Sequence, residues 1–399
     1  MKYGIQFGTI RLIIVIIVVF SQLYLFVNIR RTVKSLPGSG LFKTVALVLA
    51  AAAILLLVGV NRYLMFHPIS WTDTSWPARI FLFYFPAVWT FGSIISALAL
   101  FLVHLLTGLG RGISRIFHLF RRKERGPTGA ARRHFLKVAA GGIAAAPFAL
   151  AGYGAFRTRT AFEVKELTLP FGRALRVVQL TDIHAGIYMT REEIRKLTDR
   201  VISLRPDLLV LTGDYIANSM KFLPGCIEEM TRVRAPYGAF ATLGNHEHWY
   251  GETGRIQAVF SQYGIPLLIN AHQVIRSEQG AFAVAGIDDL GSGYPNLGAA
   301  LHGLDSNVPI LLLSHPPEIF PMAAERGVAL TLAGHYHGGQ VKLHLPSGDI
   351  SLVHLVVRYP EGLYRLKGSQ LYVSSGIGTT FTPVRLNVPP EITLLNLTV

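Results

Sequence analysis

Five short apolar runs between residues 174 and 333 each stop directly before a polar motif, and this pattern constrains the fold more than any other feature of the chain. Short apolar runs with such boundaries predict buried β-strands. Strands of this kind deliver the residues that follow them to one rim of a sheet, where the ligand sites of α/β folds collect. The runs are residues 174–180, 208–211, 238–243, 309–313 and 327–333.

The residues delivered to that rim have the chemistry of metal ligands. Two aspartates, one asparagine and four or five histidines form a nitrogen and oxygen set that suits two divalent transition-metal ions. Mg²⁺ and Ca²⁺ prefer all-oxygen shells, so the histidines favour Mn²⁺, Fe or Zn²⁺. The motifs are Asp182-Ile-His184, Gly213-Asp214, Gly244-Asn245-His246-Glu247, Ser314-His315 and Gly334-His335-Tyr336-His337.

The charge of such a centre predicts the reaction. Two divalent ions, the carboxylates of Asp182 and Asp214, and one bridging hydroxide leave a net charge of about +1, which matches a phosphate ester oxygen and its developing charge. Paired metal ions also generate that hydroxide at neutral pH and hold the phosphoryl oxygens. The residues alone therefore predict metal-assisted phosphoester hydrolysis.

Each motif taken alone has an ordinary structural interpretation. Gly213-Asp214 is a common turn after a strand, and Asn245-His246 is commonly a cap or a surface pair. The pair His335 and His337 is more specific, because residues i and i+2 point the same way on an extended segment. Five motifs in this order favour the metal site.

Several other polar residues are left outside this site. Asp288-Asp289 follows an apolar run, and a loop is the preferred interpretation. Arg385 is predicted either to touch a substrate phosphate or to form a structural salt bridge. The histidines interpreted as ordinary surface or core residues are His248, His272, His302, His344 and His354.

The motif order D-x-H, G-D, G-N-H-E, S-H, G-H-x-H resembles that of the calcineurin-like metallophosphoesterase superfamily. Within it the chain is most similar to the YkuE/YaeI-like membrane-associated bacterial phosphodiesterase branch. The run HGGQ at 337–340, the tail at 374–395 and an upstream twin-arginine motif support this likeness, which covers about residues 160–399.

The resemblance implies a role for each motif residue. His246 would be catalytic, either protonating the leaving oxygen or stabilising the transition state, and Asp214 would be catalytic as the bridge between two divalent ions. The implied ligands are Asp182, His184 and His337 for the first ion, Asn245, His315 and His335 for the second, and Asp214 for both.

The spacing of residues 192–203 predicts a helix, with Thr190 as its N-cap before two acidic residues of the first turn. Together with the strands on either side, this helix predicts a β-α-β unit, and the C-terminal half is richer in strand than in helix. The alternation predicts a layered α/β fold. The resemblance implies a four-layer α/β/β/α metallophosphoesterase sandwich for residues 160–399.

The whole chain, with a mean hydropathy of +0.40, is too apolar for an average soluble protein. The apolar excess lies in the N-terminal region. Residues 12–29, 41–60 and 80–109 are each long enough to span about 30 Å of hydrocarbon, which predicts three transmembrane helices within residues 1–110. Residues 138–156 form a fourth, weaker hydrophobic segment of the Tat signal or anchor type. The all-α transmembrane region thus precedes the sandwich.

The net charge of +15 arises in this N-terminal region. The first 160 residues hold half of the 38 Lys and Arg residues and two of the 23 acidic residues. Residues 161–399 therefore lack the basic character of a polyanion binder, and no nucleic-acid partner is expected. The basic residues cluster at 30–34 and at 111–137, in loops beside apolar segments, which is typical of cytoplasmic loops.

With those loops in the cytoplasm, the fourth segment leads outward and the catalytic domain lies on the extracytoplasmic side. Residues 131–137 (ARRHFLK) match a twin-arginine signal in the basic cytoplasmic loop 111–137, which predicts the Tat translocase as a partner during export. Residues 149–151 (ALA) resemble a signal-peptidase site. Retention of the segment as an anchor is favoured over cleavage.

These inferences predict a membrane-anchored, outward-facing binuclear metal-dependent phosphoester hydrolase. A phosphodiesterase or pyrophosphatase that acts on a cell-envelope or lipid-linked phosphoester is favoured, because little chain separates the fourth segment from the first motif. The alternatives are a phosphomonoesterase and a membrane sensor whose metal site binds a phosphorylated ligand. The single cysteine, Cys226, excludes an intrachain disulfide and is predicted to be a buried small hydrophobe.

Overall fold

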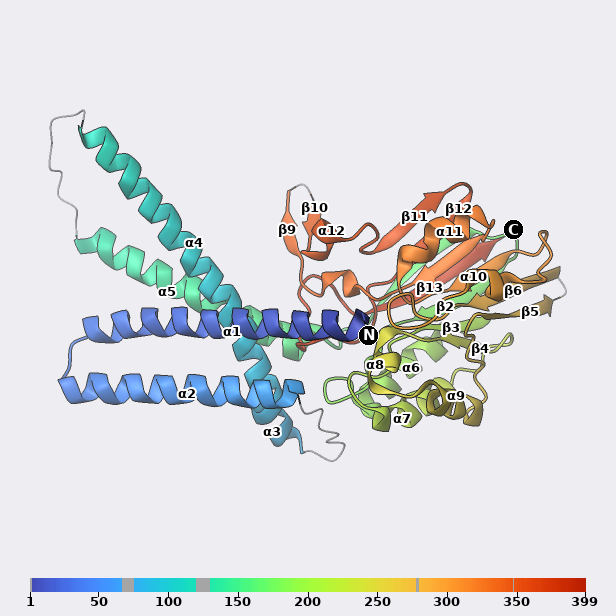
Figure 1. Cartoon of the computed structure of the whole chain (residues 1–399), viewed down its shortest axis with the longest axis horizontal. Coiled ribbons are helices and arrows are strands. Elements are labelled where there is room, and N and C mark those ends of the chain that lie inside the picture. The colour runs from blue at the N-terminus through green and yellow to red at the C-terminus, as the bar shows by residue number, and fades with distance from the viewer. Residues whose placement is uncertain (1, 67–74, 120–129, 278–279, 347) are drawn as a thin grey trace. The chain divides into compact units, whose positions relative to one another are not determined.

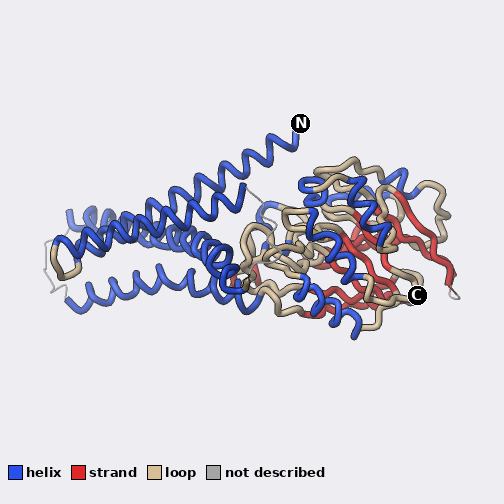
Figure 2. Tube along the Cα trace, turned by 90° about the horizontal axis from the view of Figure 1, so that it is seen from below, coloured by secondary structure: helices blue, strands red, loops and turns tan. Residues whose placement is uncertain are grey.

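The computed structural model describes residues 2–66, 75–119, 130–277, 280–346 and 348–399. The chain divides into two compact units, the first ending at Tyr153 and the second running from Gly154 to Val399. Helices make up the first unit, whereas the described strands belong to the second (Figure 1, Figure 2). The predicted basic loop 111–137 is helical in its described residues, since α4 extends to Leu119 and α5 begins at Ala130, and its residues 120–129 lie outside the described ranges.

The predicted apolar segments of the first unit are helical. Four stretches are long and apolar enough to cross a membrane, judged by length and composition: Leu12–Ser35, Gly40–Val60, Trp76–Gly110 and Val138–Thr158. The helices are α1 (Lys2–Ser35), α2 (Gly40–Phe66), α3 (Trp76–Arg79), the π-helical η1 (Ile80–Tyr84), α4 (Phe85–Leu119) and α5 (Ala130–Tyr153).

Polar side chains join these apolar helices to one another. Gln22 of α1 donates to Ser93 Oγ of α4 at 2.5 Å and accepts from Trp89 Nε1 at 3.0 Å. Ser96 of α4 donates to the carbonyl of Ala144 in α5 at 2.7 Å. Such bonds, together with close packing, hold helices together where the surroundings are as apolar as the helices themselves.

Two mixed sheets form the centre of the second unit (Figure 1). In strand order, the five-stranded sheet contains β1 (Glu163–Pro170), β13 (Glu391–Thr398), β2 (Leu175–Leu180), β3 (Leu208–Thr212) and β4 (Ala239–Thr242). The six-stranded sheet contains β11 (Gly362–Leu366), β12 (Ser369–Val373), β8 (Leu330–Ala333), β7 (Ile310–Leu313), β6 (Gly280–Gly286) and β5 (Ala271–Ser277). All five predicted strands are therefore present, as β2, β3, β4, β7 and β8.

Helices and short elements surround these sheets. A hairpin of β9 (Leu343–Leu345) and β10 (Gly348–Ile350) stands apart from both sheets. The helices of the second unit are the π-helical η2 (Gly154–Thr158), α6 (Arg191–Ser203), the 3₁₀-helical η3 (Met220–Phe222), α7 (Leu223–Met230), α8 (Asn245–Tyr250), α9 (Thr253–Gln262), α10 (Leu297–Leu301), the 3₁₀-helical η4 (Pro317–Ile319), α11 (Phe320–Glu325), the 3₁₀-helical η5 (His337–Gly339) and α12 (Val353–Val356).

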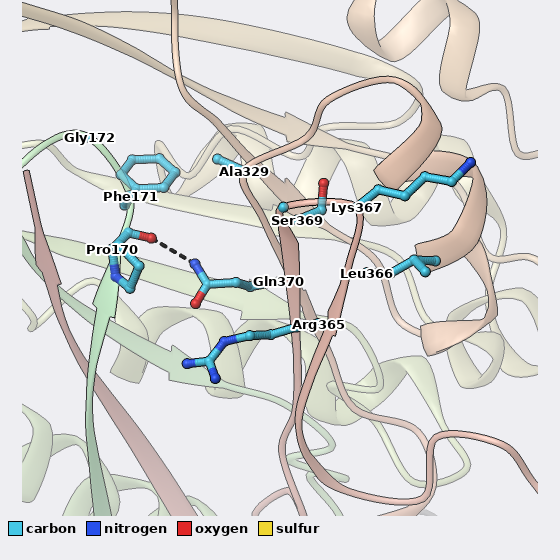
Figure 3. A pocket seen from close by; sticks show the side chains of 10 residues that line it. Pro170, Phe171, Gly172, Ala329, Arg365, Leu366, Lys367, Ser369 and Gln370 are labelled. Atoms are coloured by element: carbon cyan, nitrogen blue, oxygen red, sulfur yellow. Dashed lines mark hydrogen bonds between the residues drawn. The ribbon is translucent and has the colours of Figure 1, made fainter.

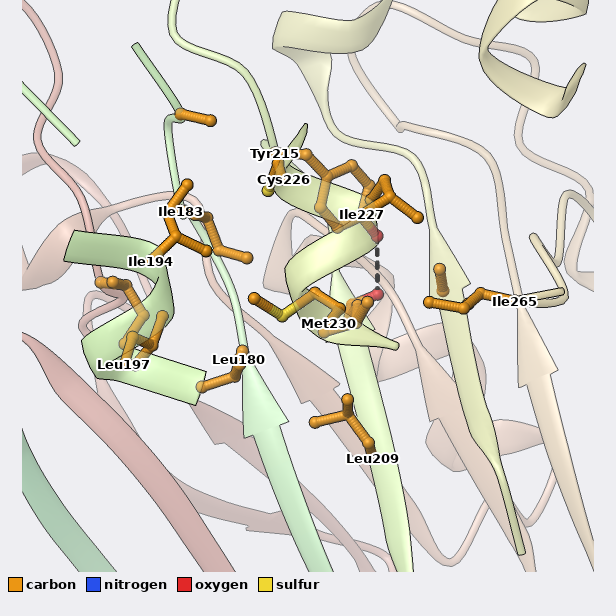
Figure 4. Packing of buried hydrophobic residues seen from close by; sticks show 14 of the residues in the cluster. Leu180, Ile183, Ile194, Leu197, Leu209, Tyr215, Cys226, Ile227, Met230 and Ile265 are labelled. Atoms are coloured by element: carbon orange, nitrogen blue, oxygen red, sulfur yellow. Dashed lines mark hydrogen bonds between the residues drawn. The ribbon is translucent and has the colours of Figure 1, made fainter. Parts of the chain in front are cut away.

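The buried side chains define four layers. One apolar cluster, including Val177 and Leu311, lies between the two sheets. A second fills the space between the first sheet and α6, α7 and α9, where Ile194 and Ile227 pack over Leu209 (Figure 4). A third joins the second sheet to α10 and α11. The predicted α/β/β/α sandwich is confirmed.

Alternation along β2 shows how sequence produces this layering. Val177 faces the second sheet, whereas Val178 and Leu180 face the helices, because successive side chains of a strand point to opposite faces. Gln179 therefore points between the sheets, where it donates to Thr212 Oγ1 at 3.0 Å and to the carbonyl of Ala333 at 2.9 Å. One buried amide thus joins the ends of β3 and β8.

The predicted N-cap of α6 is also confirmed. The Thr190 hydroxyl accepts from the N–H of Glu193, and the Glu193 carboxylate accepts from the N–H of Thr190 at 2.8 Å. This capping box starts the helix that connects β2 to β3, so it holds the β-α-β unit in place.

Ile227→Ala should destabilise the second unit, because the side chain is fully buried between α7 and the first sheet. Removing such a side chain costs about 2–5 kcal/mol and lowers the unfolding midpoint. Ile202→Ala, on the outer side of α6 with 39% exposure, is the matched control. Equal midpoints for the two variants in thermal unfolding of the detergent-solubilised chain would contradict this packing.

Candidate metal centre

The five polar motifs follow β2, β3, β4, β7 and β8. β2, β3 and β4 are parallel neighbours in the first sheet, as are β7 and β8 in the second. Their carboxyl ends therefore deliver the motifs to one rim of the sandwich. In each of three groups the ligand atoms lie within 4.8 Å of one another: Asp182, His184 and His337; His184, Asp214 and His246; and Asp214, His315 and His335.

The first half of the cluster surrounds Asp182. His337 Nε2 lies 3.2 Å from Asp182 Oδ1 and 3.1 Å from His184 Nε2. His184 Nε2 lies 3.9 Å from the same carboxylate oxygen. Three side chains from the ends of two different sheets thus direct their polar atoms to one point.

The second half of the cluster surrounds Asp214. Its Oδ2 atom lies 3.2 Å from His315 Nε2 and 3.5 Å from His184 Nε2, so one oxygen faces both halves. His335 Nδ1 lies 3.2 Å from His315 Nε2. The Nδ1 atom of His315 lies 2.8 Å from the carbonyl of Thr212, which orients the ring with Nε2 toward the cluster.

The loop after β4 adds Asn245 and His246. The His246 N–H donates to Asp214 Oδ1 at 2.9 Å, so this loop is bound to the centre of the cluster. The His246 ring is held by a contact of 2.7 Å between its Nδ1 and the carbonyl of Ala217, and its Nε2 lies 3.9 Å from Asp214 Oδ2. His246 is therefore positioned at the rim of the cluster.

The residues present fit a pair of divalent ions. Asp182 Oδ1 and Asn245 Oδ1 are both buried, and neither accepts a hydrogen bond from the described residues. Buried polar atoms are normally paired, so the unpaired oxygen of Asp182 among the histidines, and that of Asn245 directly before His246, indicate ligands for cations. Carboxylate, carboxamide and imidazole donors are also the set that Mn²⁺, Fe and Zn²⁺ accept.

The protonation states of the cluster agree with this fit. Burial alone would raise the pKa of Asp182 and Asp214, but the neighbouring imidazoles hold both pKa values below the ordinary range, so the carboxylates are ionised. Burial, and next His315, lowers the pKa of His335 to about 4, so this imidazole is neutral near pH 7. Burial opposes protonation of His315, but Asp214 and Asp182 raise its pKa, so metal binding there displaces a proton.

The backbone of the cluster is strained. Five of the seven predicted ligands have a positive φ: Asp182 at 55°, His184 at 49°, Asp214 at 55°, His335 at 79° and His337 at 51°. Non-glycine residues rarely adopt this conformation, and such strain concentrates at functional sites.

Two motif glycines allow the loops to approach these carboxylates. A Cβ atom on Gly244 would lie 2.3 Å from Asp214 Oδ1, and one on Gly334 would lie 2.3 Å from Asp182 Oδ2. The G-N-H-E and G-H-x-H motifs therefore need glycine because a carboxylate occupies the space of the missing side chain.

Glu247 has a role that sequence reasoning did not assign. Its carboxylate accepts backbone N–H groups from Gly244 at 3.0 Å, Asp214 at 2.8 Å, Tyr215 at 2.8 Å and Ile216 at 3.3 Å. Burial, and next the Asp214 carboxylate, raises its pKa above the usual range, while the N–H groups of Gly244 and Asp214 favour the ionised form that accepts their hydrogen bonds. Glu247 thus binds the loops after β3 and β4 together.

Arg385 forms no salt bridge with the described residues, so the predicted structural salt bridge is wrong, whereas the predicted contact with a substrate phosphate stays a prediction. It is fully buried and donates to the carbonyls of Ser375, Gly376 and Gly378 at 2.6 to 3.0 Å, while its Nη2 lies 3.3 Å from His337 Nδ1. Burial lowers its pKa to about 10, which still leaves it charged at neutral pH. Arg385 holds the loop after β12 against His337.

Thr380 is another residue that the motifs did not reveal. Its hydroxyl lies 3.0 Å from His337 Nε2 and 3.3 Å from His184 Nε2. Sequence offered no signal for it beyond its place in the family-like tail.

The remaining polar residues mostly serve structure. Asp288 and Asp289 form the predicted loop after β6, where Asp288 pairs with His248 at 2.7 Å and Asp289 accepts from the N–H of Ser292 at 2.6 Å. A cavity of about 570 Å³ lies beside the starts of β8 and β12, away from the motifs, and Gln370 crosses it to donate to the carbonyl of Pro170 at 2.6 Å (Figure 3). No motif residue lines this cavity.

Glu247→Gln should loosen the metal centre without replacing a predicted ligand. Gln presents an amide donor to N–H groups that need an acceptor, and leaving buried donors unpaired costs about 1–3 kcal/mol. We expect a lower unfolding midpoint and a lower metal content by elemental analysis. Glu192→Gln, at an exposed position of α6, should change neither the midpoint nor the metal content. Equal midpoints and equal metal contents for the two variants would refute the role of Glu247 in holding the loops together.

The model of the calcineurin-like phosphoesterase family matches residues 175–339. YkuE of Bacillus subtilis, described as a metallophosphoesterase, is 31% identical over 278 residues, covering 67% of this chain and 97% of YkuE. The metallophosphoesterase Cj0846 of Campylobacter jejuni is 32% identical over 56% of this chain and 59% of its own length. A transmembrane protein with a metallophosphoesterase domain from Danio rerio is 30% identical over 61% of this chain and 59% of its own length.

The residues that the family model matches carry all five motifs. The family uses a dinuclear divalent metal centre, for which the Asp and His cluster supplies ligands. The chain belongs to the calcineurin-like metallophosphoesterase family and is a metal-dependent phosphoester hydrolase with a membrane-associated helical region.

Proposed function

We propose that the chain is a multi-pass membrane enzyme whose extracytoplasmic metal centre hydrolyses phosphodiesters or pyrophosphates of the cell envelope, including lipid-linked ones. The observation that carries the hydrolytic part is the convergence of two carboxylates, four imidazoles and an unpaired carboxamide oxygen, with His246 at their rim. Mn²⁺, Fe and Zn²⁺ are the proposed metals, because the donor set is rich in imidazole.

Each ligand is assigned from its position in the cluster. Asp214 bridges, since its Oδ2 faces histidines of both halves. When bound, two divalent ions activate the attacking water and stabilise charge on the phosphoryl oxygens. The proposed ligands are Asp182, His184 and His337 for the first ion, and Asn245, His315 and His335 for the second.

His246 is proposed as the proton donor. In the hydrolysis, a bond forms between water oxygen and phosphorus, and the bond from phosphorus to the ester oxygen breaks. The leaving oxygen then needs a proton, and His246 Nε2 is available because its Nδ1 is occupied by the carbonyl of Ala217. The hydrogen bond from the backbone N–H of His246 to Asp214 Oδ1 holds this residue, and with it the imidazole, beside the metal ligands.

The outward orientation rests on charge distribution. The basic residues cluster at 30–34 and 111–137, directly after the first and third apolar segments, which supports a cytoplasmic position for both clusters. The fourth segment, preceded by Arg132 and Arg133, then leads outward with the Tat translocase as the exporting partner.

A lipid-linked or envelope substrate is supported by the short tether. The fourth candidate span reaches Thr158, and β1 begins at Glu163. The catalytic unit therefore starts within a few residues of the membrane.

Two alternatives differ in what they predict. A phosphomonoesterase would use the same centre and prefer a matched monoester over the diester. A membrane sensor would bind a phosphorylated ligand tightly and show negligible turnover, and the presence of three further spans is the feature that favours it.

Asp214→Asn and His246→Ala should separate binding from chemistry on bis-(p-nitrophenyl) phosphate with Mn²⁺. Asp214→Asn should lose both metal and activity, whereas His246→Ala should keep its metal and lose about 10²–10⁴-fold in kcat. Exposed Asp305→Asn and His302→Ala serve as controls. Wild-type protein that holds metal yet hydrolyses neither diester nor monoester would favour the sensor.

The orientation is tested with a single new thiol. Cys226 is buried, so Glu325→Cys, on an exposed position of α11, should be the reactive site. We expect a membrane-impermeant maleimide to label it in intact cells, and replacement of Arg132 and Arg133 by Lys to prevent labelling. Labelling only after permeabilisation would place the catalytic unit in the cytoplasm.

A further inference from the structure

The hairpin β9–β10 and α12 expose large apolar side chains to solvent. Leucine and valine side chains scattered singly on a surface are normal, but a group of them marks a site of interaction. The group, called the apolar patch below, consists of Leu343 (64% exposed), Leu345 (46%), Leu352 (81%), Leu355 (67%) and Val356 (79%).

The patch is arranged on two consecutive elements. Leu343 and Leu345 share one face of β9, since they are two residues apart on a strand. Leu352, Leu355 and Val356 have the i, i+3, i+4 spacing that places them on one side of α12. Two charged pairs lie beside the patch, His344 with Asp349 and Lys342 with Glu361, and the exposed Arg358 guanidinium lies over the Tyr359 ring.

The patch lies near the end of the fourth candidate span. The last residues of that span, Gly154–Thr158, belong to the second unit and contact the segment 384–386: the Arg385 N–H donates to the Gly154 carbonyl at 3.4 Å, and Thr158 donates to the Arg385 carbonyl. The next residue, Leu386, accepts from the N–H of Lys342 at 3.0 Å. β9 begins at the residue after Lys342.

The patch also adjoins the metal centre. Gly339, two residues after His337, lies so close to Ser351 and Val353 that a Cβ atom would come within 2.4 Å of the Ser351 hydroxyl. Gln340 binds both the N–H and the carbonyl of Thr380, at 2.6 and 3.0 Å. Phe381 follows, 66% exposed and with a φ of 62°, a strained position for an aromatic residue.

We propose that the apolar patch docks into the interface of the bilayer that anchors the chain, and that it presents the metal centre to phosphoesters on lipid headgroups. The substrate part of this inference rests on the proposed hydrolase function, whereas the docking part does not. The occupant is the membrane because hydrogen bonds join the end of the span, at Gly154 and Thr158, to Arg385, and join the next residue, Leu386, to Lys342, which directly precedes β9. Apolar faces of this kind bury about 5–10 Å into the headgroup boundary.

The docking is tested in the full-length chain, reconstituted in vesicles of phosphatidylcholine and phosphatidylglycerol. Leu355→Cys carries an environment-sensitive fluorophore, while Cys226 stays buried and unlabelled. We expect blue-shifted emission and loss of most of the signal when nitroxide-labelled lipids are included. Glu325→Cys, at the opposite end of β8 from the motifs, is the control and should keep water-like, unquenched emission.

Unquenched, water-like emission from Leu355→Cys would overturn the docking and leave a second copy or a soluble protein as the occupant. Leu343→Cys repeats the measurement if the first variant does not fold. This readout requires no turnover, so it fails or succeeds independently of the hydrolase function.

Activity then tests the substrate part. Leu355→Ser combined with Val356→Ser should lower hydrolysis of a headgroup phosphodiester in vesicles several-fold and leave hydrolysis of soluble bis-(p-nitrophenyl) phosphate near the wild-type rate. Equal losses on both substrates would overturn the lipid presentation. If the label at Leu355→Cys is quenched but the wild-type protein hydrolyses neither substrate, the hydrolase function is refuted while the docking stands.

Discussion

The second unit depends on the environment of one carboxylate, that of Asp214. Its Oδ1 accepts the N–H of His246, its Oδ2 faces His184 and His315, and its own N–H is bound by Glu247. Loops from β2, β3, β4 and β7 therefore meet at a single buried charge. Burying a charge costs free energy unless other groups compensate it. The imidazoles and backbone donors around Asp214 therefore all have to stay in place for the carboxylate to be stable there.

Much of this arrangement could be predicted from sequence because its signals are local. Each ligand stands directly after an apolar run, and the glycines of the motifs mark close approach to a carboxylate. The roles of Glu247 and Arg385 could not be predicted in the same way. Both act through backbone groups of folded loops, and no residue type or spacing records which N–H or carbonyl such a loop will offer.

In the helical unit the elements could be predicted from sequence, but the contacts between them could not. Length and composition were sufficient to find its four apolar helices, yet the bonds from Gln22 to Ser93 and from Ser96 to Ala144 join residues far apart in the chain. Hydropathy averages over a helix and carries no record of which polar side chain faces a neighbour. The sequence therefore predicts the apolar helices but not the contacts by which they select their partners.

Gln179 has a consequence for the geometry of the whole centre. The first ligand group combines two residues after β2, in one sheet, with His337 after β8, in the other. The amide of Gln179, fixed in β2 and bonded to Thr212 and Ala333, is a spacer of constant length between those sheets. Any sliding of one sheet over the other would separate His337 from Asp182 and His184, so the bond from Gln179 to Ala333 helps to fix the geometry of this ligand group.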